Sequence, residues 1–144
     1  MSPADPAPWL LLVAGVHLGF QLTVDLVVYP ALGDVRPEAW ASAHASHSRR
    51  ITPVVAVVYP PLVVVLGWSA VEDPGAPGTW LALAGGLLSV ATTAAVAAPA
   101  HGRLSTVGAA GRPALMRRLD RADRVRSVGA VLCVAGAVWL AVGS

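Results

Sequence analysis

Three of the four histidines in this chain have the types and spacing of a metal site. Trp40, His44, His47 and Ile51 are spaced by four, three and four residues, which places them on one stripe of a helix. Histidines at i and i+3 can share a metal ion in a helical bundle. His101 ends a later apolar run, and counting the spans puts it on the same side of the membrane. We therefore predict that His44, His47 and His101 bind iron, copper or zinc.

Two aromatic residues are candidates to line a cofactor or substrate pocket beside these histidines. Trp40 precedes His44 on the same helical stripe and would keep the site dry. Tyr59 could add a hydroxyl group to an internal pocket. The three histidines also fit a simpler role, in which they lie at the membrane interface and bond lipid headgroups or cap helix ends.

A second polar set follows one face of the first apolar run. His17, Gln21 and Asp25 are four residues apart. Ionisable groups inside a membrane span are costly and usually face the bundle interior, so these three are candidate catalytic residues. The structural alternatives are a neutral His17 bonded to Gln21 or to a hydroxyl, and an ion pair of Asp25 with Arg49 or Arg50. We predict that this ion pair forms.

Long apolar runs must position these side chains. The chain has 144 residues, of which 56% are hydrophobic and 12% charged, and its mean hydropathy is +0.66. A soluble domain has about 25% charged residues, so a soluble monomer, a disordered chain and a nucleic-acid-binding domain are excluded. A bilayer core needs about 20 apolar residues per helix. We predict an all-α fold, a bundle of four transmembrane helices, as a single integral membrane domain over residues 1–144, with spans at about 8–29, 51–70, 80–100 and 124–142.

The charges predict the topology. All ten basic residues are arginines, and the predicted spans place every one of them on the same side. The opposite side carries only Asp5, Glu72 and Asp73. The positive-inside rule makes the arginine side cytoplasmic and both termini extracytoplasmic, in a bacterial-type cytoplasmic (inner) membrane. The arginines would contact anionic lipid headgroups rather than nucleic acid.

The segment before the last span has its own pattern. Leu115, Leu119 and Ala122 recur at helical spacing, and charged residues fill the positions between them. This pattern predicts an amphipathic helix at the cytoplasmic surface, which then turns or runs into the last span. The last two spans are rich in small residues, such as Gly85 and Gly136, which let helices pack closely in lipid; the same feature would allow a homo-oligomer.

A longer pattern runs through most of the chain. It reads Gln21…Tyr29-Pro30…Trp40…His44-x2-His47…Ile51, then Pro99-x-His101-x2-Leu104 and an arginine-rich start to the last span. It resembles a group of small four-helix bacterial membrane proteins and is distantly similar to the anthrone-oxygenase-like family of domains of unknown function. The resemblance implies a membrane-embedded oxygenase or oxidase that acts on an apolar, aromatic or quinone-like substrate, with His44, His47 and His101 as the site.

Three functions stay open at this point. The first is a membrane redox enzyme with a histidine and carboxylate site near the cytoplasmic leaflet. The second is a non-enzymatic membrane subunit or scaffold whose histidines and arginines bind lipid or a partner protein. The third is a proton-coupled carrier that uses His17, Gln21 and Asp25. No motif of a soluble enzyme is present.

Overall fold

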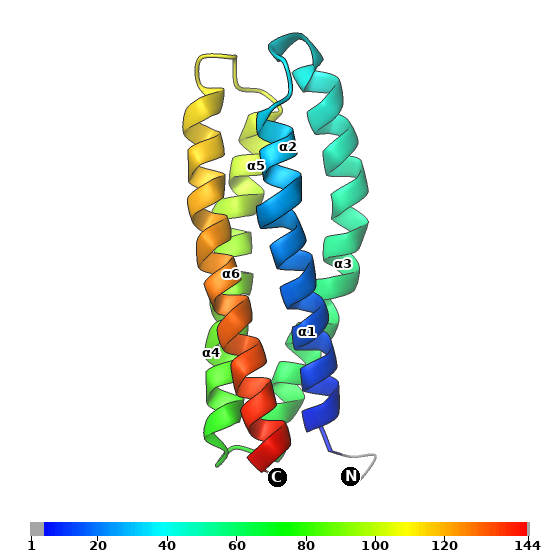
Figure 1. Ribbon diagram of the computed structural model, residues 1–144, viewed down its shortest axis with the longest axis vertical. Helices are drawn as coiled ribbons and strands as arrows, with labels where there is room; N and C mark the ends of the chain where they lie inside the picture. The colour runs from blue at the N-terminus through cyan, green and yellow to red at the C-terminus, as the bar shows by residue number, and fades with distance from the viewer. Residues whose placement is uncertain (1–4, 144) are drawn as a thin grey trace.

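The protein is a bundle of four long helical rods, shown in Figure 1 as a computed structural model that describes residues 5–143. Every regular element in that range is helical, and four helices within it are long and apolar enough to cross a membrane. The predicted all-α membrane bundle is thereby confirmed. The elements are α1 (Ala7–Thr23), η1 (Val24–Val28), α2 (Tyr29–Gly33), η2 (Pro37–Ala39), α3 (Trp40–Glu72), α4 (Pro77–Thr92), η3 (Thr93–Ala97), α5 (Ala98–Leu104) and α6 (Arg112–Gly143).

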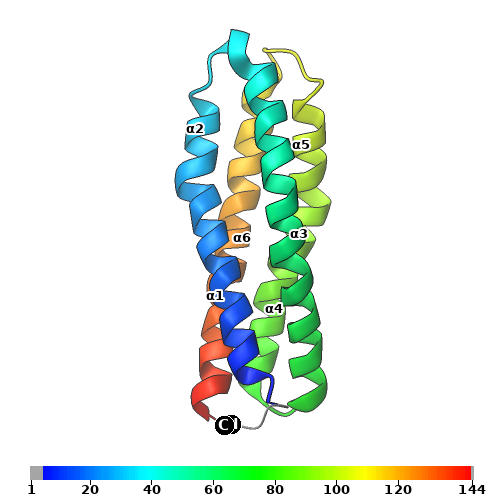
Figure 2. The same ribbon diagram turned by 90° about the vertical axis from the view of Figure 1, so that its right-hand side faces the viewer.

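The two ends of the bundle differ in their connections. Both chain termini lie at one end, together with the turn between α3 and α4 (Figures 1 and 2). The opposite end, which we call the arginine end, carries the connections at 34–36 and 105–111. α3 has 33 residues, so it is about 50 Å long, against a bilayer core of about 30 Å. The predicted second span, 51–70, is therefore only part of a helix that already begins at Trp40.

Helices α4 and α6 pack with almost no side chain between them. A methyl group on Gly85 would lie 2.5 Å from the carbonyl oxygen of Gly129, and one on Gly136 would overlap the backbone nitrogen of Ala82. In lipid the hydrophobic effect does not drive helices together, so their association depends on van der Waals packing, and small residues allow the backbones to approach closely enough for it. The small residues of the last two spans are thus used inside the bundle.

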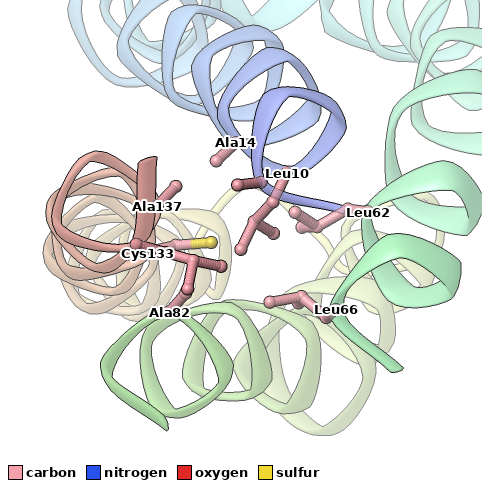
Figure 3. Close-up of a cluster of buried hydrophobic side chains, with 9 residues drawn as sticks. Leu10, Ala14, Leu62, Leu66, Ala82, Cys133 and Ala137 are labelled. Atoms are coloured by element: carbon pink, nitrogen blue, oxygen red, sulfur yellow. The ribbon is translucent and has the colours of Figure 1, made fainter. Parts of the chain in front are cut away.

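The core near the termini is apolar and joins all four rods. Its side chains meet on the bundle axis (Figure 3). The outward faces are apolar too: Val57 is 71% exposed and Val142 is 77% exposed, which is the pattern of a helix that faces lipid rather than water. The labelled core residues are Leu10, Ala14, Leu62, Leu66, Ala82, Cys133 and Ala137.

The predicted amphipathic surface helix is not a separate element. α6 runs without a break from Arg112 to Gly143, so the segment continues directly into the last span, which was one of the two predicted outcomes. Leu115 and Leu119 face the bundle as the spacing predicted, and Arg117 and Arg118 are exposed. Residues 114–128 contain neither glycine nor proline, so nothing interrupts the helix where it enters the last span.

Candidate functional site

The structure brings three of the predicted site residues together at the arginine end. The ring of His101, on α5, lies 5.9 Å from that of His44 and 5.6 Å from that of His47, both on α3 (centroid distances). Trp40 stacks on His44 with ring centroids 5.4 Å apart. Trp40 and His44 are buried, as one helical stripe directed at the bundle requires.

Two π-helical turns, which the sequence analysis missed, set the orientation of the helices beside this cluster. η1 closes with the amide of Tyr29 donating to the carbonyl of Val24, and η3 closes with the amide of Ala98 donating to the carbonyl of Thr93. In both cases the next residue is a proline, Pro30 or Pro99. A proline has no N–H and crowds the carbonyl four residues before it, so the preceding turn widens. Single π turns are frequent at functional sites.

A chain of hydrogen bonds links His101 to the buried interior. The hydroxyl of Tyr29, on α2, lies 3.1 Å from Nε2 of His101 and accepts a hydrogen bond of 3.2 Å from Nη2 of Arg126. Because a guanidinium only donates, the hydrogen of the phenol is free to point at the imidazole. Arg126 is ion-paired with Asp123 on the same helix, and Gln21 donates to Oδ1 of Asp123 at 2.5 Å.

Sequence reasoning missed Asp123 and Arg126 as buried residues. Asp123 is 0% exposed and Arg126 is 5% exposed, although the sequence pattern places Asp123 on a surface helix and Arg126 among the cytoplasmic arginines. A signal was present in the spacing. The buried stripe that includes Leu119 and Ala122 reaches Asp123 and Arg126 four residues further on. Their charge made them look solvated, but the partners that stabilise them come from α1 and α2.

The predicted ion pair of Asp25 is wrong. Among the described residues Asp25 has no ion pair; it accepts a hydrogen bond of 3.3 Å from Ser127. Arg49 and Arg50 are exposed instead. The helix begins early enough to bring them near the bundle, but neither forms an ion pair with Asp25. Gln21, the second predicted catalytic residue, is fully buried and belongs to the Asp123 network.

His17 and Tyr59 form a separate contact, deeper in the bundle. His17 is 0% exposed, and its ring meets the edge of Tyr59 at 5.1 Å. Neither ring nitrogen of His17 has a hydrogen-bond partner among the described residues. The hydroxyl of Tyr59 is paired with that of Thr93 at 2.9 Å. His17, Gln21, Asp25 and Tyr59 therefore do not join the three histidines.

A large cavity opens beside the histidine cluster. Its volume is about 860 Å³, and it lies between α3 and the rods that contain α2 and α5. Most of its wall is apolar, and His44, His47 and His101 are among its polar lining residues. Cavities of this size and character bind small molecules. The wall further includes Phe20, Val24, Tyr29, Trp40, Ile51, Val55, Ala97, Leu104, Arg49, Arg112 and Arg126.

The three histidines do not form the predicted ligand set. No group of three or more histidine, cysteine, aspartate or glutamate side chains in the described part of the chain is arranged to hold a metal ion. The ring planes of His44 and His47 lie within 19° and 29° of that of His101. A metal takes the in-plane lone pair of each imidazole, and stacked rings do not direct these lone pairs at one point. Nε2 of His101 is also engaged by Tyr29.

Comparison with protein-family models, with curated proteins and with solved structures finds no match to this chain.

Proposed function

We propose that the protein is a membrane-embedded enzyme that binds an apolar, aromatic or quinone-like molecule in the cavity and transfers a proton at it. The observation that supports this most is the position of Tyr29, whose hydroxyl lies between the imidazole of His101 and the guanidinium of Arg126 on the cavity wall. This arrangement couples a group that accepts protons to a fixed positive charge.

Each member of this group has a distinct task in the proposal. His101 takes a proton from the substrate, directly or through the hydroxyl of Tyr29. Arg126 stabilises the negative oxygen that forms, because its charge is fixed and the surroundings are apolar. Asp123 and Gln21 hold Arg126 in place. In the oxygenase or oxidase reaction that the resemblance implies, molecular oxygen would be the oxidant that takes the electrons, and these groups would take the proton that the aromatic substrate releases. The proposal uses no metal.

A chromogenic phenol tests this acid–base role. We expect 4-nitro-1-naphthol to bind to the purified protein in lipid nanodiscs with more of it in the coloured, ionised form than in water. Tyr29→Phe and His101→Gln should bind the probe but lose most of that ionisation, since proton acceptance at a positioned base contributes about 10²-fold or more. Absorbance titration of the bound probe measures the ionised fraction.

Tyr59→Phe is the matched control, because Tyr59 is also buried and hydrogen-bonded but lies outside the cavity wall. It should ionise the probe as the wild type does. Equal ionisation in the Tyr29 and Tyr59 variants would contradict the proposed role of Tyr29. A scaffold or subunit, the second function considered from the sequence, would show no saturable binding of the probe.

The orientation of the bundle is a further part of the proposal. We expect the arginine end to face the cytoplasm, because all ten basic residues fall on that half of the predicted topology. Cys133 is the single cysteine and is buried, so labelling of introduced cysteines has little background. Glu72→Cys should react with a membrane-impermeant maleimide in intact cells, and Arg117→Cys only after permeabilisation. The reverse pattern would invert the topology.

A further inference from the structure

The cavity carries positive charge without a compensating carboxylate. Arg49, Arg112 and Arg126 all line it, beside the three histidines, and no aspartate or glutamate is among the lining residues. The negative partner of Arg126, Asp123, lies behind the wall. A cleft lined by one sign of charge between apolar walls concentrates the field and attracts ligands of the opposite charge.

Several polar nitrogens in this cleft are buried without a hydrogen-bond partner among the described residues. They include Nε of Arg112 and Nε2 of both His44 and His47. Arg112 is held in place, because its guanidinium lies 4.4 Å from the ring centroid of Trp40. His44 is only 4% exposed and also stacks on Trp40. Buried polar groups are nearly always paired in folded proteins, so unpaired ones in a cavity indicate a ligand.

The remainder of the same cavity is apolar. Phe20, Val24, Ile51 and Val55 form the wall further from Arg112. A ligand that fills the space must therefore present a ring or chain to these residues while one end meets the cationic groups.

We propose that the cavity selects an apolar molecule that carries a phosphate or carboxylate group, with this anionic group held by Arg112, His44 and His47. The inference rests on the proposed function, since it specifies the class of molecule that the same cavity accepts. Arg112 supplies a permanent charge with planar donors that match the oxygens of either anion. The apolar part of the molecule then lies beside Tyr29 and His101.

Matched acids and esters test the inference. The full chain in phosphatidylcholine nanodiscs is titrated by calorimetry with 2-naphthoate and with 1-naphthyl phosphate. Methyl 2-naphthoate serves as the neutral match, and acetate and inorganic phosphate as the headgroups alone. We expect the naphthyl anions to bind about tenfold or more tightly than the ester, because charge-assisted hydrogen bonds are formed only with the anions. The small anions should bind weakly.

Substitutions of two arginines distinguish binding at a specific site from general attraction of anions to the positively charged surface. Arg112→Gln should remove most of the preference for the acid over the ester. Arg103→Gln, an exposed position outside the cavity wall, should leave the preference intact. Equal affinities of acid and ester, or equal losses in both variants, would overturn the inference while the proposed function stands. If acid, ester and 4-nitro-1-naphthol all fail to bind, the proposed function itself fails.

Changing the lipid composition of the nanodisc distinguishes two sources of the anion, a lipid headgroup and an acid that is not part of the bilayer. Part of the phosphatidylcholine is replaced by phosphatidylglycerol, which has an anionic headgroup. If this headgroup occupies the site, it competes with naphthoate, so naphthoate binding becomes weaker in the wild type but not in Arg112→Gln. Unchanged binding assigns the site to an acid that enters from outside the bilayer lipid. Both results retain the anionic headgroup as the recognised feature.

Discussion

Gly136→Val and Gly85→Val should each destabilise the bundle by about 3 kcal/mol, at the upper end of the usual cost of overpacking. Any side chain on Gly136 meets the backbone of Ala82, and one on Gly85 meets the backbones of Gly129 and Cys133. A flexible side chain could move aside, but two helical backbones can separate only by opening the whole α4–α6 contact. Unfolding in mixed micelles with increasing dodecyl sulfate, followed by circular dichroism, measures the loss.

The chain offers an internal control for this prediction. Gly15 and Gly67 also lie within helices, but apart from the adjacent residues and the nearby backbone of their own helix, no described atom lies within 4 Å of the place where their Cβ would be. Gly15→Val and Gly67→Val should change the free energy of unfolding by less than about 0.5 kcal/mol, as surface substitutions do. If all four variants are equally stable, the close packing of α4 on α6 is not what holds this pair together.

The architecture could be predicted from the sequence because its signals are local. Each apolar run is long enough to demand its own span, and the arginines mark one side without reference to any other residue. The stripe of Trp40, His44 and His47 likewise depends on spacing within one helix. Span counting is sufficient to bring His101 to the same level, and the rings of His44 and His47 each lie within 6 Å of the ring of His101.

The chemistry of the site could not be predicted in the same way, because it depends on partners from distant segments. Helical spacing determines the face on which a histidine lies but not the plane of its ring, and among the described residues no group of three such side chains is arranged to hold a metal ion. The burial of Arg126 depends on Tyr29, 97 residues earlier in the chain. Pro30 and Pro99 can be identified in the sequence. Whether a proline kinks its helix or widens the preceding turn depends on the neighbouring helices, which the sequence does not specify locally.

Asp123→Asn should cost about 3 kcal/mol or more of unfolding free energy, because it leaves the charge of Arg126 buried without its counter-ion. Asp120→Asn is the matched control on the same helix. Asp120 is partly exposed and has no ion pair among the described residues, so its replacement should cost less than about 0.5 kcal/mol. Equal unfolding curves for the two variants in dodecyl sulfate would contradict a structural role for the pair.

Removing both charges separates their effect on folding from their effect on chemistry. The double variant Asp123→Leu with Arg126→Met should recover most of the stability lost in Asp123→Asn, because replacing a whole buried ion pair by apolar residues of similar size is often close to neutral. Tyr29 and His101 then remain together, but the cation beside the phenol is gone. The folded double variant should therefore still bind 4-nitro-1-naphthol and no longer favour its ionised form. Retained ionisation in this stable protein would show that Arg126 serves the fold alone and that the proton chemistry at Tyr29 does not depend on it.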